Sequence, residues 1–239
     1  MAMLRTVWAW SAAFAATLVF GTGAILTAWI PPRGALYLRW ARGWARTVLV
    51  LSGIPVRVEV SQLAEAMPEA IFMPNHGSAI DILVLFLAVQ NHQVRFLAKR
   101  SLFSIPFLGW SMGLAGFVPV DRDRKDRARE VFEELSVKLR QGLSLVVFPE
   151  GTRSRTGELG AFKKSGFLLA LKSGMPIVPI GISGARDVLG ARGILLRPGV
   201  VTVRVGEPIP TAGLGVSHRR ELMRQVRREI IRLSSASPG

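Results

Sequence analysis

An uncharged apolar run near the N-terminus constrains this chain more than any other feature. It covers residues 6–30 and contains 25 residues without a charged side chain, whereas about 20 helical residues are enough to cross the hydrocarbon core of a bilayer. The run is too long for the apolar part of a secretory signal peptide. Tryptophans, whose indole rings favour the membrane interface, lie near its two ends: Trp8, Trp10 and Trp29. We therefore predict a membrane-anchoring helix, with a helix buried in the protein core as the alternative.

Arginines follow the apolar run. Arg33 comes first, and Arg39, Arg42 and Arg46 are then spaced so that they share one face of a helix. Such a face suits anionic lipid headgroups. Because only Arg5 precedes the run, the positive-inside rule predicts that the rest of the chain lies in the cytoplasm, at the inner membrane. Residues 1–50 are thus predicted to be membrane-anchoring helices, which either span the bilayer or dip into one leaflet.

Charge and composition limit the functional classes. The formal net charge of +15 implies a nucleic acid, an anionic membrane or a phosphorylated substrate as partner, unless it serves solubility alone. The absence of cysteine excludes disulfides, thiolate nucleophiles and zinc–cysteine sites. No recognised nucleic-acid-binding motif is present. A membrane is the better interpretation of the charge, because basic residues lie beside the apolar run.

Residues 51–239 have the pattern of one α/β domain. Helical periodicity predicts helices at residues 78–89, 124–141, 163–172 and 217–233. The pattern of apolar residues predicts strands at residues 56–60, 70–73, 94–98, 116–120, 143–148, 177–182 and 200–205. Strands that alternate with helices indicate a mixed, largely parallel sheet covered by helices.

Among the three histidines, His76 has the most distinctive surroundings. His92 lies in a polar loop and His218 begins a basic helix, so both are predicted to lie at the surface. His76 follows a predicted strand, Ser78 is a good N-cap for the next helix, and Asp81 lies in its first turn. A carboxylate on one imidazole nitrogen would fix the tautomer and leave the other nitrogen as a base. A capped helix with a nearby loop histidine is the alternative.

Three further segments bring distinctive residues to strands or strand ends. Residues 148–155 follow a strand, where α/β proteins commonly bind ligands, and Arg153 offers a planar fork suited to phosphate. A polar turn with solvated arginines is the alternative. Residues 116–122 deliver a second arginine at a strand end, and residues 178–181 form a strand with a proline, which is expected at a sheet edge or a bulge.

These segments together resemble the lysophosphatidic acid acyltransferase family of glycerolipid acyltransferases. The four blocks of that family are similar, in order, to residues 75–81, 116–122, 148–154 and 178–181. Residues 98–110 and 162–166 also resemble the family, so the likeness runs from about residue 50 to 210. One departure is Val118-Pro119, where bulkier apolar residues are common in the family.

The resemblance implies a reaction and its residues. A fatty acyl group would move from acyl-CoA or acyl carrier protein to the sn-2 hydroxyl of 1-acyl-glycerol 3-phosphate, giving phosphatidic acid in phospholipid biosynthesis. His76 would be the general base and Asp81 its orienting partner. The glycerol phosphate would be held by a set of residues from the second and third blocks: Arg122, Glu150, Gly151, Thr152 and Arg153. Lys99 and Arg100 would reach the acceptor phosphate or the donor, and Pro179 belongs to the block associated with the donor. No covalent acyl-enzyme, metal or cofactor is expected.

Other functions remain open at this level. The acceptor could be glycerol 3-phosphate, or a lyso-lipid with another head group such as ornithine. A membrane-tethered module that binds anionic lipid without turnover would keep the anchor and the arginines but would not need His76 beside Asp81. Nucleic-acid binding is suggested by the charge alone.

Overall fold

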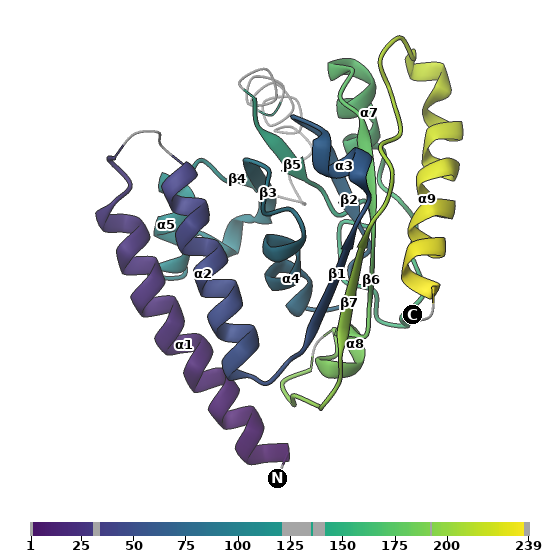
Figure 1. Cartoon of the computed structure of the whole chain (residues 1–239). Coiled ribbons are helices and arrows are strands. Elements are labelled where there is room, and N and C mark those ends of the chain that lie inside the picture. Colours follow the sequence, from purple (N-terminus) through teal and green to yellow (C-terminus); the bar gives the residue numbers. More distant parts are fainter. Residues whose placement is uncertain (1, 31–33, 121–134, 136–141, 192, 237–239) are drawn as a thin grey trace.

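The computed structural model describes the chain apart from residues 1, 31–33, 121–134, 136–141, 192 and 237–239. A twisted sheet separates two helical layers (Figure 1). The two N-terminal helices and α4 cover one face, and α7 and α9 cover the other. A hydrophobic core lies on each side of the sheet.

Among the described residues the sheet has seven strands, in the order β1-β7-β6-β2-β5-β3-β4. The β6–β7 pair is antiparallel, and the other neighbouring pairs are parallel. The mixed, largely parallel sheet expected from the sequence is therefore confirmed, and each expected strand is present with its ends shifted by at most a few residues. In chain order the strands are Val56–Val60, Ile71–Pro74, Val94–Lys99, Val118–Val120, Ser144–Val146, Ile177–Ser183 and Val201–Val205.

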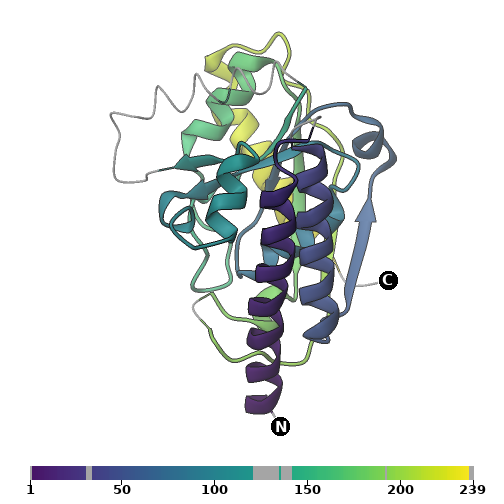
Figure 2. The same cartoon turned by 90° about the vertical axis from the view of Figure 1, so that its left-hand side faces the viewer.

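The apolar run forms α1 (Ala2–Leu26), which lies antiparallel to α2 (Ala35–Leu51) (Figures 1 and 2). Its buried side carries small residues: Ala9, Ala12, Ala16 and Ala24. Its other side exposes large apolar residues: Met3, Leu4, Val7, Trp8, Phe14, Val19 and Leu26. Only 22% of its most apolar 18-residue stretch is buried inside the protein, so the alternative of a core helix is wrong. Within the described residues, α1 is the one helix long and apolar enough to cross a membrane.

The arginine face of α2 is only partly as predicted. Arg39 and Arg46 are exposed, whereas Arg42 donates a hydrogen bond of 2.8 Å to the main-chain carbonyl of His92. Arg42 therefore joins α2 to the loop before β3, and the prediction that it faces lipid is wrong. Arg33 lies outside the described residues.

His92 was expected at the surface, and the structure corrects this prediction. Its side chain is buried and packs edge-on against Phe72, with 4.9 Å between ring centroids. Burial lowers the pKa of its imidazole. The loop is polar, and its Asn91 side chain donates a hydrogen bond to Glu65 of α3 (Gln62–Ala66). The loop nevertheless folds under α3. The sequence near His92 carries no signal for this long-range contact.

The helices beyond α2 also differ in part from expectation. The sequence predicted the regions of α4 (Ile80–Ala88), α7 (Lys164–Ser173) and α9 (Arg219–Ser235). It missed four short elements, namely α3, α5 (Leu108–Leu114), α8 (Ala185–Val188) and the turn Arg100–Leu102, while the turn Val216–His218 precedes α9. The helix predicted at residues 124–141 lies outside the described residues, except for the buried Leu135.

Pro179 lies on β6, an internal strand between β7 and β2, so the edge-strand interpretation is wrong. The ladder between β6 and β7 ends beside it. The carbonyl of Pro179 accepts a hydrogen bond of 2.9 Å from the N–H of Gly206. The carbonyl of Gly206 accepts one of 3.3 Å from the hydroxyl of Ser61. The serine hydroxyl thereby supplies a donor where proline has no N–H.

Candidate active site

His76 and Asp81 are paired at the carboxyl end of the sheet, with His76 in the loop between β2 and α4 and Asp81 in the first turn of α4. The Nδ1 atom of His76 lies 2.7 Å from the Oδ2 atom of Asp81, a carboxylate that is 1% exposed. The main-chain N–H groups of Gly77 and Ser78 each donate to the same oxygen at 2.8 Å. Because this carboxylate oxygen can only accept, the short contact places a proton on Nδ1. The Nε2 atom is then the ring nitrogen able to accept a proton.

The start of α4 departs slightly from the predicted cap. The helix begins at Ile80, with Ala79 in the cap position and no side-chain cap. Ser78 donates its hydroxyl to the carbonyl of Leu189 at 2.7 Å and accepts from the N–H of Ile80 at 3.2 Å. The serine therefore ties the histidine loop to α8 as well as to the helix start, while Asp81 satisfies the free N–H groups before the helix.

The loop after β5 holds the main chain of His76. Glu150 is buried, and its two oxygens accept from the N–H groups of His76 at 2.9 Å and Gly160 at 2.7 Å. The N–H of Ser154 donates to the His76 carbonyl at 2.7 Å. The imidazole stacks on the ring of Phe148, with centroids 3.9 Å apart. Glu150 is one of the residues expected to hold glycerol phosphate, and in the structure its carboxylate accepts from main-chain N–H groups, one of which belongs to His76.

Asn75 fixes the other side of the histidine loop. Its side-chain amide donates to the carbonyl of Ile182 at 2.9 Å and accepts from the Ile182 N–H at 2.7 Å. These bonds join the end of β2 to β6 after the strand ladder has ended. The sequence placed Asn75 and Phe148 in family blocks but gave neither of them a role.

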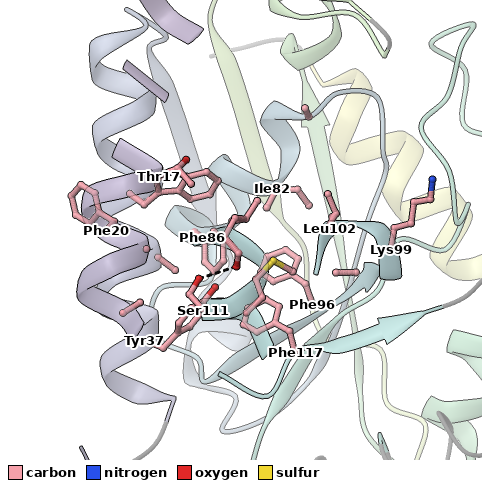
Figure 3. Close-up of a pocket in the computed structure, with 18 of the residues that line it drawn as sticks. Thr17, Phe20, Tyr37, Ile82, Phe86, Phe96, Lys99, Leu102, Ser111 and Phe117 are labelled. Carbon is pink, nitrogen blue, oxygen red and sulfur yellow. Dashed lines mark hydrogen bonds between the residues drawn. The ribbon is translucent and has the colours of Figure 1, made fainter. Parts of the chain in front are cut away.

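A cavity of about 550 Å³ opens beside His76. Aromatic side chains from both N-terminal helices and from the sheet side line it (Figure 3): Phe20, Tyr37, Trp40, Trp44, Phe86, Phe96 and Phe117. Lys99, at the end of β3, lies on the far side of the cavity from α1 and α2 in this view. Arg153 also lines the cavity. One compartment therefore combines apolar walls, the side chain of His76 and the two cationic side chains of Lys99 and Arg153.

The other predicted site residues are placed as follows. Lys99, Thr152 and Arg153 are exposed. Gly151 has a φ of +72°, in the left-handed region that favours glycine, and so permits the sharp turn between Glu150 and Thr152. Pro179 is buried in the sheet and is not among the residues lining the cavity.

Arg122 lies outside the described residues. Within the part of the chain that is described, no cluster of three or more His, Asp or Glu side chains could hold a metal ion.

Comparison with known proteins adds a family and a fold. The Acyltransferase family matches residues 55–183, more than half of the chain. The 1-acyl-sn-glycerol-3-phosphate acyltransferase BAT2 of Brassica napus is 37% identical over 141 residues, covering 58% of this chain and 40% of the relative. The 1-acyl-sn-glycerol-3-phosphate acyltransferase of Pseudomonas aeruginosa is 29% identical over 217 residues, covering 89% of this chain and 83% of the relative.

The chain spans about half the length of several curated relatives that it matches, for example 47% of an Arabidopsis thaliana chloroplast enzyme. A solved structure, the 1-acyl-sn-glycerophosphate (LPA) acyltransferase PlsC from Thermotoga maritima, superposes with a TM-score of 0.83. The alignment covers 100% of this chain and 98% of that one, at 24% identity. This likeness shows that the two chains share their fold.

Proposed function

Since the chain belongs to the Acyltransferase family, and the matched residues 55–183 contain His76 and Asp81, we propose that it transfers a fatty acyl group from a thioester to a lysophospholipid. The acceptor is the sn-2 hydroxyl of 1-acyl-glycerol 3-phosphate, and the product is phosphatidic acid. The observation that carries the proposal is the pairing of His76 with a buried carboxylate beside an apolar cavity that also presents two cations.

In this mechanism His76 acts as a general base. Its Nε2 atom takes the proton of the acceptor hydroxyl while that oxygen attacks the thioester carbonyl. The tetrahedral intermediate then collapses, a C–O bond replaces the C–S bond, and the leaving thiolate takes the proton from His76. Asp81 stabilises the imidazolium that forms in between. Proton transfer of this kind typically contributes about 10²–10⁴-fold in rate.

The cavity supports the assignment of lipid substrates. Its volume of about 550 Å³ is within the usual range of roughly 300–1,000 Å³ for small-molecule sites. Its aromatic walls suit an acyl chain, and Lys99 and Arg153 suit the acceptor phosphate through charge-assisted hydrogen bonds. Arg122 is proposed as a further phosphate ligand. The donor is acyl-CoA or acyl carrier protein.

The packing of α1 favours an in-plane membrane anchor. The helix has 25 residues and is therefore roughly 37 Å long. It contacts the catalytic domain near both of its ends, since Trp10 donates to the carbonyl of Ile194 and Gly21 lies against Phe107. If α1 crossed the bilayer, the packed domain would enter the hydrocarbon with it. We therefore propose that α1 lies along one leaflet, on the cytoplasmic side.

An acyl-transfer assay with matched histidine variants tests the function. Wild type, His76→Ala and His218→Ala are purified in lipid and given a labelled acyl thioester with lysophosphatidic acid, glycerol 3-phosphate or other lyso-lipids. His218 is the control because it is exposed. We expect transfer to lysophosphatidic acid that is lost in His76→Ala and kept in His218→Ala.

Each other outcome has a defined meaning. Transfer to a different acceptor alone would refute the named substrate and keep the mechanism. Equal activity of His76→Ala would refute the role of the histidine. Binding of anionic vesicles with no transfer to any acceptor would favour a lipid-binding module.

A further inference from the structure

A loop of the catalytic domain lies against the N-terminal half of α1. This segment, residues 193–197, is part of the connection between α8 and β7, which passes close to the N-terminal end of α1 in both views (Figures 1 and 2). The indole N–H of Trp10 donates to the carbonyl of Ile194 at 2.9 Å. The N–H of Leu196 donates to the hydroxyl of Thr6 at 3.0 Å. The 193–197 loop is thus fixed to the membrane anchor by two side chains of α1.

The loop presents two consecutive large apolar side chains to the outside. Ile194 is 72% exposed and Leu195 is 46% exposed. The neighbouring surface is apolar as well, because Trp8 of α1 is exposed and its indole donates to the carbonyl of the exposed Leu51 at the end of α2. Three segments that are distant in sequence therefore expose apolar residues at one end of the molecule. An exposed apolar surface of this kind marks a contact with a membrane or another protein.

We propose that the 193–197 loop inserts into the bilayer beside α1, so that the catalytic domain itself contacts lipid. The loop enters the boundary between the headgroups and the acyl chains of an anionic bilayer. Continuity with the exposed face of α1 is the first argument, and it rests on the membrane association in the proposed function.

The hydrogen bonding of the loop is the second argument. Main-chain polar groups that enter lipid need partners within the protein. The Ile194 carbonyl and the Leu196 N–H have theirs on α1. The N–H of Gly193 donates to the carbonyl of Gly190 in the same connection, and the N–H of Arg197 donates to the carbonyl of Val188 at the end of α8, each at 2.9 Å. These four groups can enter a less polar environment without losing a partner.

Charge is the third argument. Arg197, which ends the loop, is exposed. Arg5 lies at the same end of the molecule, where it donates to the carbonyls of Ser52 and Gly53 at 3.2 and 2.9 Å. Cations that border an apolar tip suit anionic headgroups.

The loop would have a mechanical role. A protein held in a leaflet by one apolar helix can roll about the axis of that helix. A second lipid contact, made by the domain, prevents that rotation and fixes the orientation of the cavity beside His76 relative to the membrane.

Site-specific labelling tests the insertion, because the native chain has no cysteine. Ile194→Cys is labelled with an environment-sensitive dye. Phe14→Cys on the exposed face of α1 is the positive control, and Val216→Cys, an exposed apolar position before α9, is the negative control. Each full-length protein is bound to vesicles of phosphatidylethanolamine and phosphatidylglycerol, with and without brominated acyl chains.

We expect the dye at position 194 to shift to shorter wavelength, to be quenched by the brominated lipid and to resist aqueous iodide, as at position 14. The dye at position 216 should remain open to iodide. If position 194 behaves like 216 while position 14 is quenched, the inference is overturned. If position 14 is also open to water, the membrane association in the proposed function fails together with the inference.

Vesicle binding by two unlabelled aspartate variants tests the insertion independently. The double variant Ile194→Asp, Leu195→Asp should require at least about tenfold more lipid for half-maximal vesicle binding than Val216→Asp, because two apolar side chains lose burial. Its thermal unfolding in detergent should match that of wild type, since both side chains are exposed. Unchanged vesicle binding would overturn the inference.

Discussion

Replacement of Asp81 by asparagine is expected to remove most of the activity while leaving the fold intact. In the structure the Oδ2 atom of Asp81 accepts from His76 Nδ1 and from two main-chain N–H groups, while the Oδ1 atom is buried without a partner among the described residues. An asparagine of the same shape can place its oxygen at the Oδ2 position and its amide nitrogen at the Oδ1 position. The two main-chain bonds then survive, but the charge that stabilises the imidazolium is lost.

The magnitude follows from the role of the pair. If the carboxylate is needed for His76 to act as a base, Asp81→Asn should lower kcat/KM by about 10²–10⁴-fold. That factor equals roughly 2.7–5.5 kcal/mol of transition-state stabilisation. Asp81→Ala removes the acceptor for three donors, and each buried donor left without a partner costs about 1–3 kcal/mol. The alanine variant should therefore lose stability as well as activity.

The assay combines transfer of a labelled acyl group to lysophosphatidic acid with thermal unfolding followed by circular dichroism. Asp187→Asn is the matched control, because Asp187 is an exposed carboxylate on α8. We expect normal activity from the control, and an inactive Asp81→Asn that unfolds close to the wild-type temperature. Activity of Asp81→Asn within about threefold of wild type would refute the assignment of Asp81, since the expected loss is at least about 10²-fold.

Three further predictions concern packing, phosphate binding and pH. Gly181→Ala should lower the free energy of unfolding by about 1–3 kcal/mol or more, because a Cβ atom there would overlap the backbone of α9. Urea denaturation measures this change. An unchanged urea midpoint would contradict the close packing of β6 and α9. Arg153→Ala should raise KM for lysophosphatidic acid by roughly 10–150-fold, which corresponds to about 1.5–3 kcal/mol for a charged hydrogen bond. Arg155→Ala should leave this KM unchanged, because Arg155 is exposed and is not among the residues lining the cavity. Equal effects of the two substitutions would argue against a phosphate site at Arg153. Burial lowers the pKa of His92 from its ordinary value of 6.5. Below about pH 6.5 the folded state therefore binds fewer protons than the unfolded state, and the free energy of unfolding should fall as the pH drops. Urea denaturation between pH 7 and pH 5 should show that the free energy of unfolding depends less on pH in His92→Gln than in wild type, whereas the exposed His218→Gln should behave like wild type. An identical pH dependence in wild type and His92→Gln would refute the contribution of His92.

Local patterns in the sequence predicted most of the secondary structure. Strands such as Ile177–Ser183 are nearly continuous apolar runs that are buried on both faces. The capping-type spacing from Ser78 to Asp81 predicted a turn in which a carboxylate reaches back to the main chain, and that contact is present. These features depend on residues a few positions apart, which is the range over which periodicity carries information.

The structure changed the roles of residues whose partners are distant in the chain. The family resemblance implied that Glu150 is a substrate ligand, and the structure adds that both of its oxygens accept from main-chain N–H groups. His92 looked like a surface residue from its polar loop, yet it is buried under α3 against Phe72. Pro179 looked suited to an edge strand, yet it lies inside the sheet. Each difference arises from a contact that no local pattern records.

The sequence by itself determined that the chain has an apolar helix, an α/β domain and a histidine with a carboxylate five residues later. Only the tertiary structure decided that α1 packs along the domain, that Lys99 and Arg153 share a cavity with His76, and that Thr6 meets Leu196. The physical reason is the same in each case. Apolar periodicity specifies which face of an element must be buried, but the fold of the whole chain decides which other element covers that face.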